Sequence, residues 1–137
     1  PVGFYNRKGI YLRQLSERLI ELGDVPTTVD EIAALPGIGP KMAYLAVNAC
    51  WHTCQGIGVD VHVHRIANRL GWAESRTPEQ TRVQLEELLP DTIWPDVNHL
   101  LVGFGQTICQ ARKPRCPDCL LRDICPSSSV IGGSEDD

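Results

Sequence analysis

The stretch Leu35-Pro36-Gly37-Ile38-Gly39-Pro40-Lys41 lies between two helical segments and predicts a tight hairpin that joins them. The preceding segment, residues 29–35, opens with a Thr28-x-x-Glu31 capping box, and the following one, residues 41–50, is rich in Ala, Met, Leu and Val. Glycines in such a turn can adopt backbone conformations that are closed to other residues, and they leave main-chain N–H groups open at a helix start, where a phosphate binds. A plain helix–helix turn is the alternative. The candidate phosphate-binding residues are Gly37, Ile38 and Gly39.

Lys41 and Asp60 are the candidate catalytic side chains. Lys41 follows Pro40 in the first helical turn, where the positive end of the helix dipole disfavours an ammonium group and so favours the neutral, nucleophilic amine. Asp60 precedes another helical segment, so that one carboxylate oxygen can cap the helix while the other faces a cleft. The alternatives are an exposed surface lysine and an aspartate that only caps.

The rest of the chain repeats apolar residues at spacings of three and four, and no stretch alternates convincingly at period two. The sequence therefore predicts an all-α fold. Its other helices are expected over residues 6–22, ended by Gly23; over residues 61–70, ended by Gly71; from Pro78 after a Thr77 cap, with Val83, Leu85, Leu88 and Leu89 as the apolar face; and over residues 94–109.

Composition sets the size and the surroundings of the protein. A chain of 137 residues with 42% hydrophobic content can form one compact domain or two small lobes. No apolar run of about 18 residues and no leader sequence is visible, which indicates a soluble intracellular protein. The net charge of −4 is unfavourable for binding nucleic acid, but three of the acidic residues, Glu135, Asp136 and Asp137, lie at the C-terminal end. The rest of the chain is close to neutral, so any surface that binds nucleic acid must be a local basic patch.

Four cysteines follow the last predicted helix with the spacing C-x6-C-x2-C-x5-C, and they indicate a metal centre. Disulfides are disfavoured in a reducing compartment. Zinc is the stronger alternative, but zinc ribbons usually supply two C-x2-C pairs, whereas a single pair flanked by lone cysteines favours a larger iron–sulfur group. Cys50 and Cys54 are interpreted as small buried apolar residues. The proposed ligands are Cys109, Cys116, Cys119 and Cys125.

Three cations, Arg112, Lys113 and Arg115, lie between the first two of these cysteines. A loop that a metal centre holds in place can present such cations to phosphates. A merely solvated basic loop is the alternative.

Taken together, the hairpin with Lys41, the stretch Val59-Asp60-Val61-His62-Val63-His64-Arg65 and the cysteine loop resemble the endonuclease III family of helix-hairpin-helix DNA glycosylases. The resemblance runs from about Gly3 to Cys125 and is closer to eukaryotic members. It implies that residues 1–55 are the C-terminal part of a six-helix lobe and that residues 56–125 form a helical iron–sulfur lobe. Residues 126–137 consist mainly of Ser, Gly and acidic residues, and this composition predicts a disordered acidic tail. Family members carry further N-terminal helices, so the resemblance implies that this sequence corresponds to the C-terminal part of the family fold.

The resemblance also implies a bifunctional enzyme of base-excision repair. Lys41 would attack C1′ of a flipped-out nucleotide and form a Schiff base, Asp60 would stabilise positive charge or handle protons, and strand cleavage would follow by β-elimination. The implied cofactor is a 4Fe-4S cluster. The implied partner is double-stranded DNA with an oxidised pyrimidine or an abasic site, bound by a monomer in the nucleus or mitochondrion without membrane contact.

Phe4 lies where family members present an apolar residue at a loop tip, so it is a candidate wedge that fills the gap left by the extruded base. A core position beneath the first helix is the equal alternative. Two other functions remain open: a monofunctional adenine-mismatch glycosylase, against which Lys41 argues, and a non-catalytic DNA-binding fragment.

Overall fold

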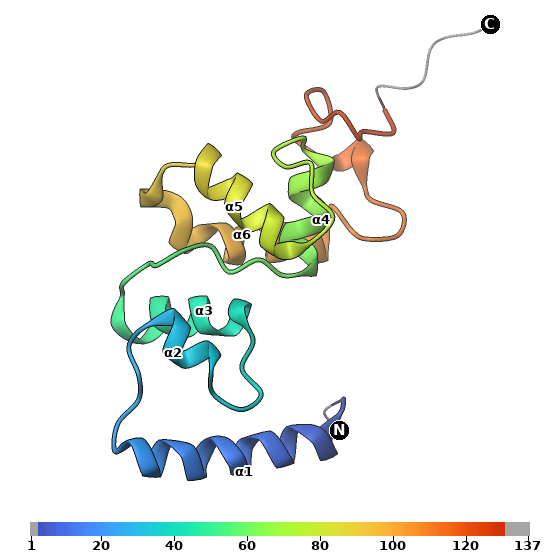
Figure 1. The fold of residues 1–137 in the computed structure, drawn as a ribbon. Coiled ribbons are helices and arrows are strands. Elements are labelled where there is room, and N and C mark those ends of the chain that lie inside the picture. Colours follow the sequence, from blue (N-terminus) through green and yellow to red (C-terminus); the bar gives the residue numbers. More distant parts are fainter. Residues whose placement is uncertain (1–2, 131–137) are drawn as a thin grey trace, which may run out of the picture. The chain divides into compact units, whose positions relative to one another are not determined.

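The computed structural model describes residues 3–130, and every regular element in that part of the chain is a helix (Figure 1). The predicted all-α class is thereby confirmed. None of the helices in the described part is long and apolar enough to cross a membrane. In chain order the elements are α1 (Tyr5–Leu22), α2 (Val29–Ala33), α3 (Pro40–Trp51), α4 (Val61–Arg69), α5 (Pro78–Leu88), the 3-10 helix η1 (Asp91–Ile93), α6 (Trp94–Thr107) and the 3-10 helix η2 (Cys116–Asp118).

The helix ends follow local capping chemistry. Gly23 adopts a left-handed conformation with φ of 78° and donates its N–H to Leu19 O at 3.0 Å, which ends α1 as predicted. Thr28 Oγ1 accepts from the Glu31 N–H at 3.4 Å and starts α2, and Thr77 Oγ1 accepts from the Gln80 N–H at 3.2 Å and starts α5. These caps are strictly local, so a sequence pattern of four residues is enough to predict them.

Two helix ends differ from the prediction by two residues, and the other predicted ends agree to within one residue. Helix α2 ends at Ala33 rather than at residue 35, because the Leu35 N–H donates to Ile32 O at 3.1 Å in a tighter turn. Helix α6 ends at Thr107 rather than at residue 109, because the N–H groups of Ile108 and Cys109 both bond to Phe104 O at 2.9 Å. That tightened last turn releases the chain into the cysteine loop.

The chain divides into two compact units, residues 1–55 and residues 56–137. In the first unit α2 packs against α3 around the buried side chains of Val29, Ile32, Ala43 and Val47. Helix α1 has no buried residue, and Leu12 on its apolar face is 64% exposed. The predicted helix therefore exists, but its apolar face lines only an open concavity beside the hairpin.

In the second unit α4 packs against α5 and α6 (Figure 1). The residues Val63, Ile66 and Ala67 form a stripe at spacings of three and four on α4, and each is completely buried. Ile57 from the loop before α4 and Leu85 from α5 complete the centre of this core.

The predicted apolar face of α5 is wrong at two positions. Val83 and Leu88 are 41% and 54% exposed, whereas the polar residue Thr81 is fully buried. Its hydroxyl is satisfied there, because Thr81 Oγ1 lies 2.6 Å from both His64 Nδ1 and Ser75 Oγ and donates to Thr77 O at 3.1 Å. Burial of a hydroxyl group with three such neighbours costs little free energy. The buried face of α5 therefore includes Thr81, which the hydrophobic pattern did not predict.

Residues 126–130 continue in turns beside the cysteine loop. The rest of the predicted acidic tail, residues 131–137, lies outside the described residues.

Candidate functional site

The hairpin between α2 and α3 depends on one of its two glycines. Gly37 has φ of 77°, and a Cβ atom there would come within 2.6 Å of Tyr11 Cβ and Cγ, so both the backbone and the close approach of α1 require glycine. Gly39 has φ of −99° and open space around it. The expectation that both glycines adopt a special conformation is therefore wrong for Gly39. The Ile38 N–H is used within the turn, where it donates to Leu35 O at 3.2 Å.

Lys41 is the second residue of α3 and follows Pro40, which occupies the first helical position. Its side chain is half-buried. The structure thus places this lysine in the helical turn adjoining the hairpin, where the N-terminal dipole of α3 acts on it.

Phe4 adopts a left-handed conformation with φ of 58° immediately before α1, and its carbonyl accepts the Lys8 N–H at 3.0 Å. Its side chain is 82% exposed. Phe4 is therefore no core residue of the described structure.

Asp60 is the N-cap of α4. Its Oδ1 accepts hydrogen bonds from the N–H groups of His62 at 2.8 Å and of Val63 at 2.9 Å. The capping prediction is confirmed, and the half-buried carboxylate is held in one orientation by two backbone donors.

The loop before Asp60 is held from two other helices. Glu86 in α5 accepts the Ile57 N–H at 2.8 Å, and Asn98 in α6 donates from Nδ2 to Gly58 O at 2.6 Å. Because these loop residues are also buried, the position of Asp60 is set by the packed core of the second unit. Lys41 belongs to the first unit and Asp60 to the second.

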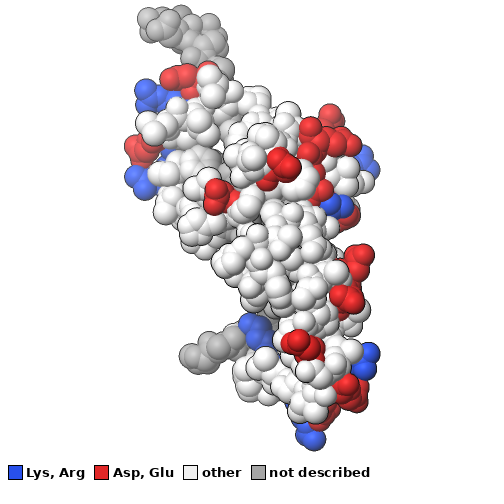
Figure 2. All heavy atoms as spheres, turned by 90° about the vertical axis from the view of Figure 1, so that its left-hand side faces the viewer, with Lys and Arg blue, Asp and Glu red and all other residues white. Residues whose placement is uncertain are grey.

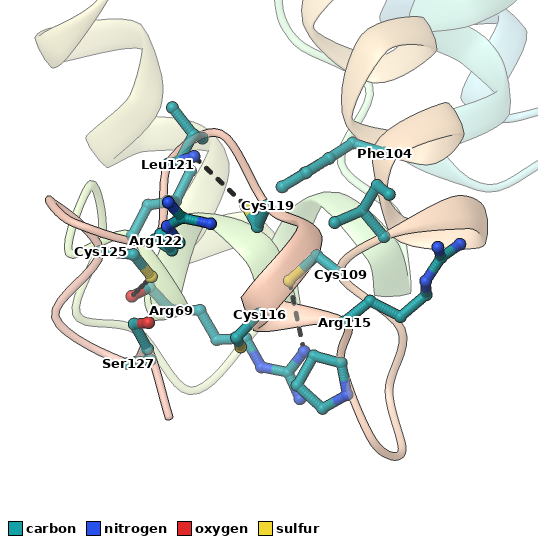
Figure 3. Close-up of a pocket in the computed structure, with 14 residues that line it drawn as sticks. Arg69, Phe104, Cys109, Arg115, Cys116, Cys119, Leu121, Arg122, Cys125 and Ser127 are labelled. Carbon is teal, nitrogen blue, oxygen red and sulfur yellow. Dashed lines mark hydrogen bonds between the residues drawn. The ribbon is translucent and has the colours of Figure 1, made fainter. Parts of the chain in front are cut away.

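The four candidate ligand cysteines line one cavity in the second unit (Figure 3). Each is half-buried and carries a free thiol. The remaining lining comes from the ends of α4 and α6 and from the loop itself, and it includes no histidine and no carboxylate. The cysteines concerned are Cys109, Cys116, Cys119 and Cys125.

The side chains that line this cavity indicate which kind of metal group it would hold. Within residues 3–130, no three or more His, Cys, Asp or Glu side chains lie close enough together to bind a single metal ion. Four sulfur donors spread around a cavity fit a polynuclear iron–sulfur group, in which each iron takes one thiolate. Ser129 lowers the pKa of the Cys116 thiol through backbone and side-chain hydrogen bonds, and the charge of Arg69 adds a smaller lowering. A lowered pKa favours the thiolate, which is the form that binds metal.

The three cations of the predicted basic patch, Arg112, Lys113 and Arg115, are exposed. Arg115 forms an exposed ion pair with Asp118, with Nη2 to Oδ2 at 2.8 Å. On the face drawn in Figure 2, Lys and Arg occur as separate groups beside Asp and Glu. Such a surface is consistent with local phosphate contacts rather than broad electrostatic attraction.

Two arginines near the cysteine loop were not predicted. Arg65 Nη2 donates to Cys109 O at 2.9 Å, and Arg69 Nη1 donates to Cys109 Sγ at 3.3 Å. Both lie on α4 at a spacing of four, which places them on one face of the helix, and this spacing is the one signal in the sequence that relates them. Their partners are about 40 residues away in sequence, and no local pattern reveals such contacts.

The chain is similar in sequence to known DNA repair proteins. Residues 1–91 match the family model described as HhH-GPD superfamily base excision DNA repair protein. The chain is 52% identical over 132 residues to endonuclease III-like protein 1 of Gallus gallus, covering 93% of this chain and 47% of that protein. It is 53% identical over 131 residues to the endonuclease III homolog of Schizosaccharomyces pombe, covering 93% and 37%.

Solved structures show the same fold. A trapped endonuclease III–DNA covalent intermediate in an estranged-adenine complex superposes with a TM-score of 0.85 at 32% identity, over 92% of this chain and 60% of that one. A non-covalent endonuclease III–DNA complex gives 0.84 at 32% identity, over 91% and 59%. The chain spans about half, or less, of the length of the first two relatives. With the family model covering well over half of the sequence, the chain belongs to the HhH-GPD superfamily of base excision DNA repair proteins and is endonuclease III-like within it.

Proposed function

We propose that this chain supplies the hairpin, the lysine, the aspartate and the cysteine loop of a bifunctional DNA glycosylase and abasic-site lyase that removes oxidised pyrimidines. The observation that carries the proposal is Lys41 in the first turn of α3, directly after the hairpin. A covalent complex with DNA is known for a similar protein, and a lysine amine is the nucleophile that forms such an adduct with a sugar carbon.

The reaction requires two bond exchanges at C1′. The neutral amine of Lys41 forms a bond to C1′ while the glycosidic bond breaks, and the base leaves with the bonding electron pair and gains a proton. The adduct nitrogen then loses a proton and its lone pair forms the C1′=N bond, while the C1′–O4′ bond breaks and O4′ takes the electron pair and a proton. The ring-opened product is a protonated Schiff base between C1′ and the lysine nitrogen. Loss of a proton from C2′ expels the 3′ phosphate, which cleaves the strand by β-elimination.

Asp60 would assist by stabilising positive charge on the sugar or by accepting a proton. Its orientation is already fixed by the cap hydrogen bonds to α4. Such pre-organisation favours an electrostatic role, because a fixed carboxylate needs no reorganisation when charge develops.

DNA contacts are assigned to the hairpin residues Gly37, Ile38 and Gly39 and to the basic loop. The Ile38 N–H is already bonded within the turn, so the remaining main-chain N–H groups at the start of α3 would bind phosphate without reading the base sequence. Exposed cations at Arg112 and Lys113 would add to this binding. The exposed side chain of Phe4 suits the wedge role, since it is available to fill the gap in the base stack.

The cysteine loop is proposed to hold a four-iron four-sulfur cluster, which when bound supplies a rigid cross-link for the loop. Protein prepared anaerobically should contain iron and inorganic sulfide and absorb broadly at visible wavelengths. One zinc ion per chain without iron would contradict this assignment.

Trapping with borohydride tests the catalytic proposal, because it reduces a Schiff base to a stable amine and leaves the protein covalently attached to DNA. The chain should be trapped on duplex DNA that carries an oxidised pyrimidine. Lys41→Ala should abolish trapping while DNA binding persists. Lys8→Ala is the matched control, since Lys8 lies in the same unit on α1 and should leave trapping intact.

The other outcomes identify the alternatives. Base removal without trapping would indicate a monofunctional glycosylase. Binding without base removal or trapping would indicate a non-catalytic DNA-binding fragment, and full trapping by the Lys41→Ala variant would remove this lysine from the mechanism.

A further inference from the structure

Arg69, at the end of α4, contacts both ends of the cysteine loop (Figure 3). Its Nη1 donates to Cys109 Sγ at 3.3 Å, so the guanidinium reaches the first cysteine of the loop. Its own backbone carbonyl lies 3.6 Å from Cys125 Sγ, the last cysteine. One helical residue therefore lies between two sulfurs that are 40 and 56 positions away in sequence.

The same guanidinium also holds the backbone that follows Cys109. Arg69 Nη1 donates to Gln110 O at 2.7 Å, and Nη2 donates to Ala111 O at 3.1 Å. The planar guanidinium has donors in a fixed fork, which lets it reach the sulfur and two carbonyls at once. A lysine ammonium is a compact point charge and cannot reproduce this geometry.

We propose that Arg69 is a positioning residue for the iron–sulfur cluster, which fixes the first turn of the cysteine loop and donates an N–H···S hydrogen bond to the Cys109 thiolate. This proposal rests on the cluster assignment made under the proposed function. In that state the sulfur of Cys109 is an acceptor with negative charge, and a cationic donor strengthens the hydrogen bond. Cys125 loses its proton when it binds iron, so its distance to the Arg69 carbonyl then reflects packing only.

Two consequences follow for a bound cluster. A hydrogen bond and a positive charge at a thiolate ligand stabilise the more negative, reduced cluster, which raises its reduction potential. Anchoring of the loop on α4 also slows the separation of Cys109 from iron.

The other arginines that line the cavity are held differently. Arg115 pairs with Asp118 at 2.8 Å, and Arg122 donates to Pro117 O at 2.8 Å and lies 3.5 Å from Asp123 Oδ1. In residues 3–130 neither arginine hydrogen-bonds to a cysteine sulfur, in contrast to Arg69. Arg122 is therefore a matched control from the same cavity.

The experiment compares wild-type holoprotein with the variants Arg69→Lys, Arg69→Gln and Arg122→Lys, all purified anaerobically. Iron release to a chelator is followed through the loss of visible absorption, and the reduction potential is measured by spectroelectrochemical titration. Both Arg69 variants should release iron roughly tenfold faster or more, because loss of a group that hydrogen-bonds to a metal ligand typically weakens metal binding by roughly tenfold to a hundredfold. Their potentials should shift to more negative values, whereas Arg122→Lys should match the wild type.

The reduction potential of the cluster distinguishes the proposed role from a merely structural one. Loosening of the loop alone would speed the release of iron, whereas a shift of the potential requires the loss of the charge-assisted hydrogen bond. If both Arg69 variants keep the wild-type potential, the proposal is overturned. If the variants do not retain a cluster, resonance Raman spectra of the wild type decide: solvent deuteration should shift the Fe–S(Cys) bands, and unshifted bands would overturn the N–H···S bond. Zinc without iron in the wild type would instead overturn the cluster assignment and, with it, this inference.

Discussion

Arg65 Nη2 donates a hydrogen bond to the backbone carbonyl of Cys109 at 2.9 Å, and this bond ties α4 to the start of the cysteine loop. The same nitrogen lies 3.3 Å from Gly105 O and from His62 Nδ1. Because Asp60 caps the same helix, α4 links the candidate catalytic carboxylate mechanically to the cysteine loop. This link depends on the close approach of α4 and α6.

Gly105 is the residue that permits this approach. A Cβ atom there would lie 2.7 Å from His62 Nδ1 and 2.9 Å from Ile66 Cδ1, so Gly105→Ala should lower the free energy of unfolding by about 1–3 kcal/mol. Gly103→Ala in the same helix is the control: nothing lies within 4 Å of its Cβ, and the gain in helix propensity should stabilise by up to about 1 kcal/mol. Urea denaturation of both variants measures the difference, and equal effects would contradict the packing argument.

Asp60 has a capping role and a proposed catalytic role, which substitutions can separate. Asn caps helices about as well as Asp, so Asp60→Asn should change stability by only a few tenths of a kcal/mol while it slows base removal by roughly a hundredfold or more. Asp60→Ala should slow the reaction as well and cost about 1 kcal/mol of stability through the lost cap. Single-turnover rates and thermal melting test both, and an Asp60→Asn variant with full activity would leave Asp60 only its structural role.

Phe4→Ala should leave the melting temperature almost unchanged, because the side chain is 82% exposed. If Phe4 is a wedge, the variant should excise a paired oxidised base more slowly than the wild type but cleave a preformed abasic site nearly as well. Without the wedge, the unstacking energy of roughly a few kcal/mol raises the barrier of the step in which the paired base is extruded. Equal impairment on both substrates would argue against the wedge.

The basic loop should contribute to the salt dependence of DNA binding. If Arg112 and Lys113 each contact a phosphate, their double replacement by Ala should reduce the slope of log K against log salt by about 0.9 per contact, or about 2 in total. Replacing Arg13 and Arg18 together is the control, since they are exposed on α1 and paired with Glu17 and Glu21. An unchanged slope for the loop variant would show that these cations are only solvated.

Much of the fold was already determined by local sequence. Gly23 ends α1, and Thr28, Asp60 and Thr77 start their helices through contacts within three or four residues. Cap and turn chemistry acts over one helical turn, and a pattern in the sequence therefore predicts it. The order of the hairpin, Asp60 and the four cysteines was enough to indicate the family.

Tertiary structure decided which residues are buried and which distant side chains are in contact. Cys50, interpreted from its apolar neighbours as buried, is exposed, and Thr81 rather than Val83 enters the core of the second unit. The contacts of Arg65 and Arg69 with Cys109 join positions about 40 residues apart. Sequence periodicity specifies which side of a helix is apolar, but burial and hydrogen-bond partners depend on which surface another helix covers, and that is decided only when the distant segments pack together.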